Sequence, residues 1–309
     1  RVALITGGSR GIGRMMAEGF LRAGTARVYI TARKAGACDE TAQALNALGC
    51  GGTCIAMPAD VSTVDGAREL ATALAQQEVA LDILVNNAGA AWGEAFETFP
   101  EKGWDKVMDL NVKTPFFLTQ ALHGLLSKAA GNGRAAKVIN VASIDGISVN
   151  PWETYSYAAS KAGLIHLTKR MALRLVKDNI VVSGIAPGAF PSEMNKEARD
   201  HGEEVARHIP SGRIGVPDDM AGIAVYLASR AGDYVVGQTI AVDGGVTLAE
   251  QSEESGVAAL AVAAALRPSA YRWTASVVVA THAAPVLSRS PWGVKATLGP
   301  SSLTLRAIL

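Results

Sequence analysis

Short apolar runs rich in β-branched residues alternate along the chain with longer segments in which apolar residues recur every three or four positions. "GIGRMMAEGFLRAG" (11–24) is typical of the longer segments, and the short runs span 1–6, 27–32, 52–57, 82–87, 137–142, 179–186 and 238–244. The first pattern is that of a buried strand and the second that of an amphipathic helix. Their repeated alternation predicts an α/β fold, a doubly wound parallel sheet of about seven strands with helices on both faces.

A change of composition near residue 250 divides the chain into two predicted parts. Residues 256–309 contain no Asp or Glu and are rich in Ala, Ser, Val and Pro. We therefore predict one Rossmann-type domain over 1–250 and a C-terminal extension over 251–309. For the extension, disorder, a family-specific addition and an altered reading frame all remain open.

Bulk properties exclude several classes of partner. The chain has 309 residues, 49% of them hydrophobic, and a net charge of +1. This balance predicts no global attraction to nucleic acid or to an anionic membrane, and no apolar run approaches the ~20 residues of a membrane span. Cys38, Cys50 and Cys54 have no His nearby at metal-ligand spacing, so we predict reduced thiols, no metal site and a cytoplasmic location. Because the chain begins without Met in an apolar run, we expect a few leading residues to be missing.

The segment "ITGGSRGIG" (5–13) joins the first predicted strand to the first predicted helix. A helix start offers unpaired N–H groups and a partial positive charge, and glycines at 7, 11 and 13 allow a pyrophosphate to approach the backbone. Glycine turns also serve as simple strand–helix connections, but the surrounding βαβ pattern favours a dinucleotide site.

The residues after the second predicted strand indicate which dinucleotide binds. Folds that bind NAD usually carry an acidic residue there, to bind the ribose 2′-hydroxyl. This chain has Arg33 and Lys34, and Arg10 lies within the glycine turn. Because Arg pairs well with phosphate, these cations favour NADP, unless they are merely solvated.

Tyr157 and Lys161 lie four positions apart in "SYAASKAG" (156–163). That spacing puts both side chains on one face of a helix, where they could be an ordinary surface pair or an acid and the cation that tunes it. The pair by itself does not decide between these two interpretations.

Six motifs together resemble the classical short-chain dehydrogenase/reductase family over about residues 1–248. They are "TGGSRGIG" (6–13), "NNAG" (86–89), Asn111 in "DLNVK", Ser143 in "NVASIDG", "YAASK" (157–161) and "PG" (187–188), in family order and at family spacing. The stretches "ILVNNAGAAWGE", "INVASIDGIS" and "IAPGAFPSEM" look like bacterial 3-oxoacyl-[acyl-carrier-protein] reductases, in the branch linked to rhamnolipid precursors.

The resemblance implies a catalytic set of Asn111, Ser143, Tyr157 and Lys161. Tyr157 would donate the proton to the substrate carbonyl, Ser143 would hydrogen-bond that carbonyl, and Asn111 would hold a water linked to Lys161. We expect the Lys161 ammonium to lower the pKa of Tyr157 from about 10, since a charge at ~4 Å supplies on the order of 4 kcal/mol.

The resemblance also implies cofactor contacts along the sheet edge. Lys161 would bind the nicotinamide ribose and Phe190 and Ser192 would contact the cofactor, although the family more often has Thr where Ser192 stands. The full predicted set for NADP is Gly7, Ser9, Arg10, Gly11, Ile12, Gly13, Arg33, Asp60, Val61, Asn87, Ala88, Gly89, Tyr157, Lys161, Pro187, Gly188, Phe190 and Ser192.

The predicted substrate is a small-molecule carbonyl compound. In the family, residues 189–215 form a mobile lid, and we expect an apolar wall for an acyl chain from Trp92, Trp152, Phe190, Met194 and Ile209, which could instead be lid packing or a dimer contact.

A substrate carried on acidic acyl carrier protein would need a basic surface. Candidates are Arg134, Lys137, Lys169, Arg170, Arg174 and Lys177, which could also be an ordinary solvated surface.

We therefore expect an NADPH-dependent reductase of a 3-oxoacyl thioester in fatty acid biosynthesis, assembled as a homotetramer or homodimer. The alternatives are a reductase of another ketone or secondary alcohol, and a catalytically silent nucleotide-binding homologue.

Overall fold

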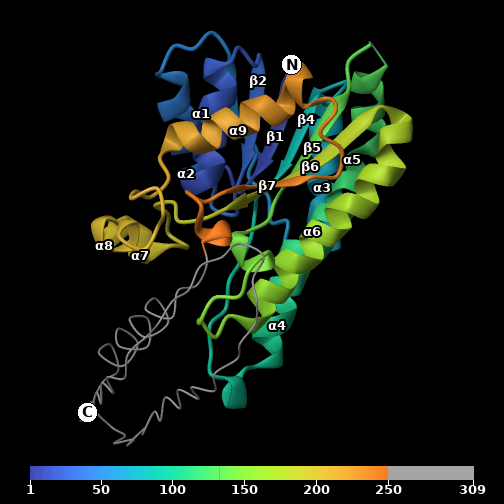
Figure 1. The fold of residues 1–309 in the computed structure, drawn as a ribbon. Helices are drawn as coiled ribbons and strands as arrows, with labels where there is room; N and C mark the ends of the chain where they lie inside the picture. The colour runs from blue at the N-terminus through green and yellow to red at the C-terminus, as the bar shows by residue number, and fades with distance from the viewer. Residues whose placement is uncertain (132, 250–309) are drawn as a thin grey trace, which may run out of the picture. The chain divides into compact units, whose positions relative to one another are not determined.

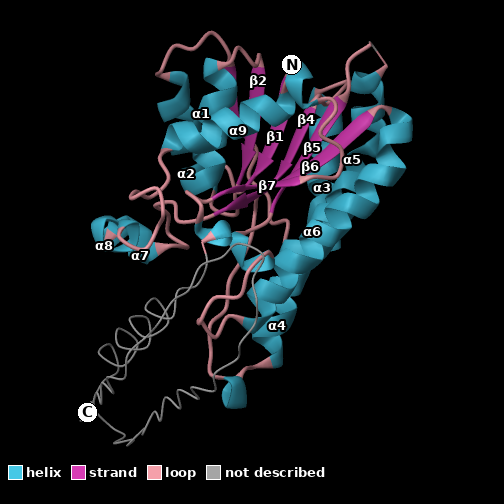
Figure 2. Ribbon diagram, in the orientation of Figure 1, coloured by secondary structure: helices cyan, strands magenta, loops and turns pink. Residues whose placement is uncertain are grey.

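The computed structural model describes residues 1–131 and 133–249, and it confirms the predicted α/β architecture (Figures 1 and 2). Seven parallel strands form one sheet in the order β3-β2-β1-β4-β5-β6-β7. The strands are Val2–Thr6 (β1), Arg27–Thr31 (β2), Thr53–Ala56 (β3), Ile83–Asn86 (β4), Ala136–Val141 (β5), Ile180–Pro187 (β6) and Thr239–Val242 (β7). Each strand overlaps the apolar run that predicted it.

Helices cover both faces of the sheet (Figure 2). They are Gly11–Arg22 (α1), Ala35–Asn46 (α2), Val64–Gln77 (α3), Glu101–Met108 (α4), Thr114–Ala130 (α5), Tyr155–Leu175 (α6), Lys196–Asp200 (α7), Gly202–Ala206 (α8) and Pro217–Ala228 (α9). Phe20, Leu45 and Leu227 of α1, α2 and α9 pack in the core on one face, while Leu74 and Leu122 of α3 and α5 pack in the core on the other. Every residue of β1, β4, β5 and β6 is buried because both faces of these strands are covered.

The direction in which the chain crosses the sheet reverses between β1 and β4. These two strands are neighbours, although β2 and β3 come between them in sequence. In open parallel sheets, ligands bind beyond the carboxyl ends of the strands at such a point. The loops that follow β1, β4, β5 and β6 carry most of the predicted site residues, so the topology brings them to one edge.

Residues Arg1–Ala249 form one compact unit. The predicted C-terminal extension, 251–309, lies outside the described residues. Within the part of the chain that the structure describes, no helix has the length and apolar character needed to cross a membrane.

Candidate active site

The turn between β1 and α1 brings together glycine backbones at positions where a side chain would not fit. Gly7 and Gly11 have φ angles of +65° and +52°, in the left-handed region that favours glycine. A Cβ atom on Gly13 would lie 2.3 Å from the carbonyl oxygen of Gly7. The first turn of α1 contains no acidic residue. The bare N-terminus of α1 can therefore receive a phosphate group.

The remaining predicted residues of this turn lie around it. Arg10 is exposed and precedes the first residue of α1, while Ile12 packs against the core behind the turn. The carbonyl of Ser9 accepts a hydrogen bond from Thr41 Oγ1 at 2.7 Å. Thr41 belongs to α2 and was not selected from the sequence, because no local pattern marks a contact between this helix and the glycine turn.

Exposed cations flank the turn on the side of β2. Arg10, Arg33 and Lys34 take part in none of the ion pairs found within residues 1–131 and 133–249. The backbone N–H of Ser62 holds the pKa of Asp60 below its usual value, and the Arg33 charge adds a smaller effect in the same direction. Arg33 and Asp60, both members of the predicted cofactor set, therefore lie close enough to interact.

The loop after β3 is tied to two helices. A Cβ atom on Gly66, in α3, would lie 1.9 Å from the carbonyl oxygen of Asp60, so only glycine allows this approach. The carbonyl of Val61 accepts a hydrogen bond from Thr114 Oγ1, in α5, at 2.5 Å. Asp60 and Val61, both members of the predicted cofactor set, are thereby held at the sheet edge.

The turn after β4 is hydrogen-bonded to the glycine turn. Thr6 Oγ1, at the end of β1, accepts hydrogen bonds from the backbone N–H groups of Asn87 and Ala88, both at 2.9 Å. The Asn87 side chain donates in return to the carbonyls of Thr6 and Gly7, at 2.9 and 3.1 Å. Thr6 was not among the predicted site residues, although it stands within the motif that located the turn.

Gly89, in the turn after β4, lies next to two of the predicted catalytic side chains. A Cβ atom on this residue would lie 3.2 Å from Oδ1 of Asn111 and 3.7 Å from Nζ of Lys161. The predicted cofactor residues and the predicted catalytic residues therefore share one region of the sheet edge.

Tyr157 and Lys161 are not an ordinary surface pair. Both lie in the first two turns of α6, and Lys161 is only 4% exposed. Its Nζ donates a hydrogen bond to the carbonyl of Val141, at the end of β5, at 2.8 Å. The same nitrogen lies over the ring of Tyr157, 5.5 Å from the centroid. The pair is therefore held at the edge of the sheet through the bond from Lys161 to the end of β5.

The expected lowering of the Tyr157 pKa by Lys161 is not what the structure gives. Burial raises the pKa of Tyr157 to about 12, while the Ser143 hydroxyl lowers it and the Asp145 charge raises it further. The physical reason is that burial penalises the phenolate, and the ammonium lies over the ring. Burial likewise lowers the pKa of Lys161 to about 8, against a smaller opposing effect of Asp145.

Ser143 follows β5 and begins a short 3₁₀ helix, Ile144–Gly146. Its side chain is buried, and its Oγ accepts a hydrogen bond from the backbone N–H of Asp145 at 3.2 Å. Because Ser143 lowers the pKa of Tyr157, the two hydroxyl groups are neighbours. Asp145, which the sequence analysis did not select, is the carboxylate that acts on both Tyr157 and Lys161.

Asn111 lies in a π-helical segment, Asp109–Lys113, between α4 and α5. Its Nδ2 donates to the carbonyl of Ala90 and to Ser160 Oγ, each at 2.9 Å, and its Oδ1 accepts from the Ala90 N–H at 2.8 Å. Both hydrogens of the amide are thus used within the protein. A water held by this side chain would have to donate to the second lone pair of Oδ1.

The loop after β6 begins at the sheet edge and returns over the glycine turn. Pro187 pairs with Val242 of β7, and a Cβ atom on Gly188 would lie 2.8 Å from Asp243. Further along, the Cβ of Ser192 would lie 3.2 Å from a Cβ atom placed on Gly11. Ser192 therefore lies beside the glycine turn, and its contact with a cofactor stays a prediction.

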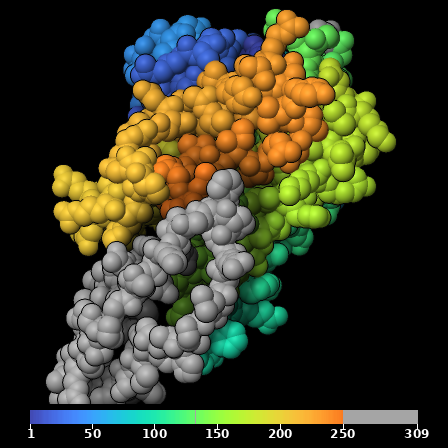
Figure 3. Space-filling model, in the orientation of Figure 1, coloured from blue at the N-terminus to red at the C-terminus, as the bar shows by residue number. Residues whose placement is uncertain are grey.

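Only part of the predicted apolar wall faces outward. Phe190 and Ile209 are 2% and 7% exposed, and the Phe190 ring packs on Gly215 at the base of the lid (residues 189–215). Met194 and Trp152 are more than half exposed. In the space-filling view the gold lid residues form a lobe that projects from the domain (Figure 3). Phe190 and Ile209 therefore hold the base of the lid.

Trp92 covers Gly103 of α4, where an added Cβ atom would lie 2.7 Å from the indole ring. The ring also lies 5.4 Å from Nζ of Lys106. Trp92 is therefore packed on α4, which leaves Met194 and Trp152 as the more exposed members of the predicted wall.

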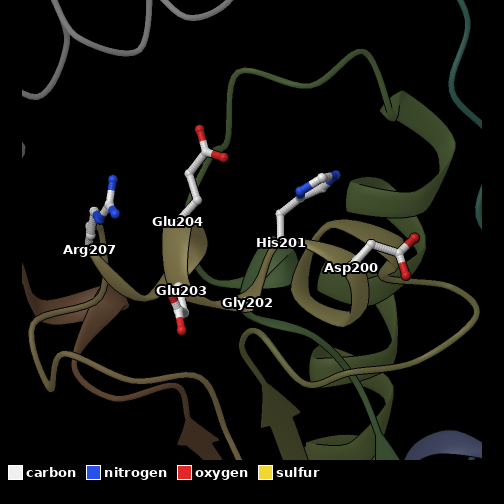
Figure 4. A pocket seen from close by; sticks show the side chains of 6 residues that line it. All are labelled: Asp200, His201, Gly202, Glu203, Glu204 and Arg207. Carbon is white, nitrogen blue, oxygen red and sulfur yellow. The ribbon is translucent and has the colours of Figure 1, made fainter.

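A hollow of about 430 Å³ on the lid has a charged lining but no predicted site residue (Figure 4). It is lined by Asp200, His201, Gly202, Glu203, Glu204 and Arg207. The side chains of Glu203 and Glu204 point in opposite directions, so their carboxylates do not converge on one point (Figure 4). Among the described residues, no group of His, Cys, Asp and Glu side chains could hold a metal ion.

The prediction that Lys137 belongs to a basic docking surface is wrong. Lys137 is only 1% exposed, because it lies within β5, where its Nζ is 2.6 Å from a carboxylate oxygen of Asp233. Arg174 is exposed but pairs with Asp178 at 2.7 Å. Lys169, Arg170 and Lys177 remain exposed on α6 and just after it.

Comparison with known proteins gives consistent matches over the domain. A family model described as enoyl-(acyl carrier protein) reductase matches residues 7–247. The rhamnolipids biosynthesis 3-oxoacyl-[acyl-carrier-protein] reductase of Pseudomonas aeruginosa is 48% identical over 80% of this chain and 96% of its own length. The 2-dehydro-3-deoxy-D-gluconate 5-dehydrogenase of Escherichia coli is 40% identical over 79% of this chain and 94% of its own length.

A solved structure shares the same fold. The Pseudomonas aeruginosa RhlG/NADP active-site complex has a TM-score of 0.76 and 48% identity, and covers 80% of this chain and 96% of its own. The glycine turn, the Tyr157–Lys161 pair with its buried lysine and these matches lead to one assignment. The chain belongs to the short-chain dehydrogenase/reductase family and is an NAD(P)-dependent oxidoreductase.

Proposed function

We propose that the protein uses NADPH to reduce the 3-oxo group of an acyl thioester to a hydroxyl group. The observation that carries the proposal is the grouping of Ser143, Tyr157 and Lys161 beside the phosphate turn. Its substrate class is supported by the 48% identity with the rhamnolipids biosynthesis 3-oxoacyl-[acyl-carrier-protein] reductase.

The proton in this reaction is held at the hydroxyl of Tyr157. With a pKa of about 12, this phenol is protonated at neutral pH, as a proton donor must be. Bound NADPH supplies the hydride. The product alkoxide is nearly as strong a base as hydroxide, whose conjugate acid, water, has a pKa of about 15.7, so transfer from Tyr157 runs downhill. We propose that Ser143 hydrogen-bonds the substrate oxygen and that Lys161, with its pKa near 8, supports reprotonation.

NADP is the preferred cofactor in this proposal. The exposed guanidinium groups of Arg10 and Arg33 flank the turn, and Asp60 is engaged by the backbone N–H of Ser62. A guanidinium can bind a ribose 2′-phosphate through paired hydrogen bonds. A carboxylate in the same place would repel that phosphate. The NADP complex of the 48% identical relative supports the same choice. We also propose that the remaining residues of the predicted cofactor set contact NADP.

The acyl chain is proposed to lie against the exposed apolar side chains at the mouth of the site. Met194 and Trp152 are 52% and 66% exposed, so both side chains can offer apolar surface to a ligand. Lys169 and Arg170, on the helix that carries Tyr157, and Lys177, just after that helix, offer a positive surface that suits an acidic carrier protein. A soluble, cytoplasmic role in fatty acid or rhamnolipid precursor synthesis follows from this proposal.

We further propose that the protein acts as a homodimer or homotetramer, as is usual in the family. The pairing helices in that arrangement are α6 and the helix that contains Asn111. Phe116 and Leu173 expose apolar surface in this region, at 39% and 66%. Sedimentation of the purified protein tests the assembly.

The decisive assay follows NADPH absorbance with acetoacetyl thioester, with simple ketones and sugar ketones, and with an enoyl thioester. Oxidation of NADPH with the 3-oxo thioester supports the proposal. Oxidation with the other ketones alone would favour the second candidate, a dehydrogenase of another carbonyl compound, which the 40% identity with a deoxygluconate dehydrogenase supports. Activity with the enoyl thioester alone would contradict both.

A further inference from the structure

A chain of buried hydrogen bonds joins Asn111 to the backbone of the catalytic helix. Nδ2 of Asn111 donates to Ser160 Oγ at 2.9 Å, and Ser160 Oγ donates to the carbonyl of Tyr157 at 2.7 Å. Ser160 is fully buried and Asn111 is 1% exposed, so water does not compete for these bonds.

At the other end of this chain of hydrogen bonds, Asn111 is held by two hydrogen bonds to Ala90. The amide of Asn111 both donates to the carbonyl of Ala90 and accepts from its N–H, at 2.9 and 2.8 Å. This reciprocal pairing sets the orientation of the amide, because the donor and acceptor ends cannot be exchanged. One Nδ2 hydrogen is left, and Ser160 takes it.

Ser160 is placed between the two proposed catalytic residues of α6. It directly precedes Lys161, and its hydroxyl donates to the carbonyl of Tyr157. In an α-helix that carbonyl also accepts from the N–H four residues later, which here belongs to Lys161. The hydroxyl of Ser160 therefore donates to the same carbonyl through which Tyr157 is hydrogen-bonded to Lys161 within the helix.

We propose that Ser160 is a positioning residue, whose hydroxyl holds the Tyr157–Lys161 turn of α6 in register with the π-helical segment and the turn after β4. This inference rests on the proposed catalytic role of Tyr157. Ser160 touches neither substrate nor cofactor in this account. It acts by fixing the place of the phenol relative to the phosphate turn, where a displacement of about 1 Å can cost on the order of 100-fold in rate.

Ser156 provides a matched control on the same helix. It lies one helical turn before Ser160 and is also fully buried. Within the described residues its Oγ has no hydrogen-bond partner. Replacing either serine by Ala removes the same buried atom, but only Ser160→Ala breaks the chain of hydrogen bonds.

The test compares Ser160→Ala and Ser156→Ala in the full-length protein. The rate is measured per folded site, counted by NADPH titration, well below the melting temperature of each variant. We expect Ser160→Ala to lower kcat about 10-fold or more, with less than about threefold change in either KM, and Ser156→Ala to change kcat less than twofold. Equal kcat values for the two variants would overturn the proposal, since burial alone would then explain both.

A second variant covers the case in which Ser160→Ala does not fold. Ser160→Cys keeps the size of the side chain but replaces the hydroxyl by a weak donor and acceptor. We expect kcat per folded site to fall at least about threefold, and a wild-type kcat would refute the positioning role. Tyr157→Phe separates this inference from the proposed function. If that variant kept its activity the proposed chemistry would fail, whatever the result at Ser160.

Discussion

The ammonium nitrogen of Lys161 lies over the ring of Tyr157, 5.5 Å from its centroid, and is anchored to the carbonyl of Val141 at 2.8 Å. The strand end therefore holds the amine, and the amine in turn lies over the phenol. Burial acts on both groups, raising the pKa of Tyr157 to about 12 and lowering that of Lys161 to about 8. In this arrangement the neutral phenol and a readily deprotonated amine coexist at one edge of the sheet.

Tyr157→Phe tests the proposed proton donor. The change removes the hydroxyl and keeps the ring, so the shape of the site should be preserved. We expect kcat for reduction of a 3-oxo thioester to fall about 100- to 10,000-fold, the usual contribution of a general acid. NADPH binding, followed by fluorescence titration, should change less than threefold. A variant with half of the wild-type kcat would rule out Tyr157 as the donor.

Lys161→Met tests the cost of burying the ammonium. Below pH 8 this lysine is protonated in both the folded and the unfolded chain, and the folded state bears the full burial cost. Between its folded pKa of about 8 and its usual value of 10.5, the unfolded chain binds more protons, so the stability of the wild type rises with pH relative to the variant. We expect the free energy of unfolding of the variant to exceed that of the wild type most at pH 7, by up to about 3 kcal/mol.

Urea unfolding of the cofactor-free wild type and of Lys161→Met at pH 7, 9 and 10 measures this difference. The advantage of the variant should shrink steadily over that range. A difference independent of pH would mean that Lys161 keeps its ordinary pKa in the folded protein.

Arg33→Asp tests the choice of cofactor. A guanidinium that binds the 2′-phosphate should be worth about 1.5–3 kcal/mol, which is roughly 10- to 100-fold in affinity. We expect the KM for NADPH to rise by that factor and the KM for NADH to fall. Arg68→Asp is the control, because Arg68 is an exposed residue of α3 that pairs with Asp65. If NADH already served the wild type as well as NADPH, the assignment of NADP would be incorrect.

Gly146→Ala tests how closely the turn after β5 lies on the catalytic helix. A Cβ atom there would lie 2.6 Å from the carbonyl carbon of Lys161 and 2.7 Å from the N atom of Ala162. We expect the variant to lose about 1–3 kcal/mol of unfolding free energy, and kcat to fall as the turn is pushed away. Gly36→Ala is the control, since a Cβ atom at that position in α2 meets nothing within 4 Å. Thermal melts of both variants should show a loss for Gly146→Ala alone.

Asp233→Asn tests the buried ion pair of β5. Lys137 is 1% exposed, and removing the charge of its partner leaves an ammonium without compensation. Breaking such a pair costs about 3–5 kcal/mol, and we expect about 3 kcal/mol because the side chain of Asp233 is 40% exposed. Asp65→Asn breaks an exposed pair and should cost less than about 1 kcal/mol. Similar losses in the two variants, measured by urea unfolding, would contradict this account of Lys137.

The fold could be predicted from the sequence because its signals are local. Each buried strand is a short apolar run, and the glycine turn stands directly after the first of them. The family motifs then led to Tyr157 and Lys161, which the structure brings together. For these elements, a window of about a dozen residues contains the information.

Other features could not be predicted because they depend on distant partners. Lys137 was assigned to an exposed surface, but it lies in a strand whose burial is complete and pairs with Asp233 far along the chain. The bond between Asn111 and Ser160 requires a π-helical segment that nothing in "DLNVK" signals. The raised pKa of Tyr157 reflects the burial of the folded site, which sequence spacing does not report.

The contact between Ser192 and Gly11 has a kinetic consequence. The loop that begins at Gly188, after β6, lies with Ser192 against the turn proposed for the dinucleotide phosphates. If a dinucleotide binds in that way, this loop has to move before the phosphates can leave the turn. We therefore expect the release of the oxidised dinucleotide to depend on the motion of this loop.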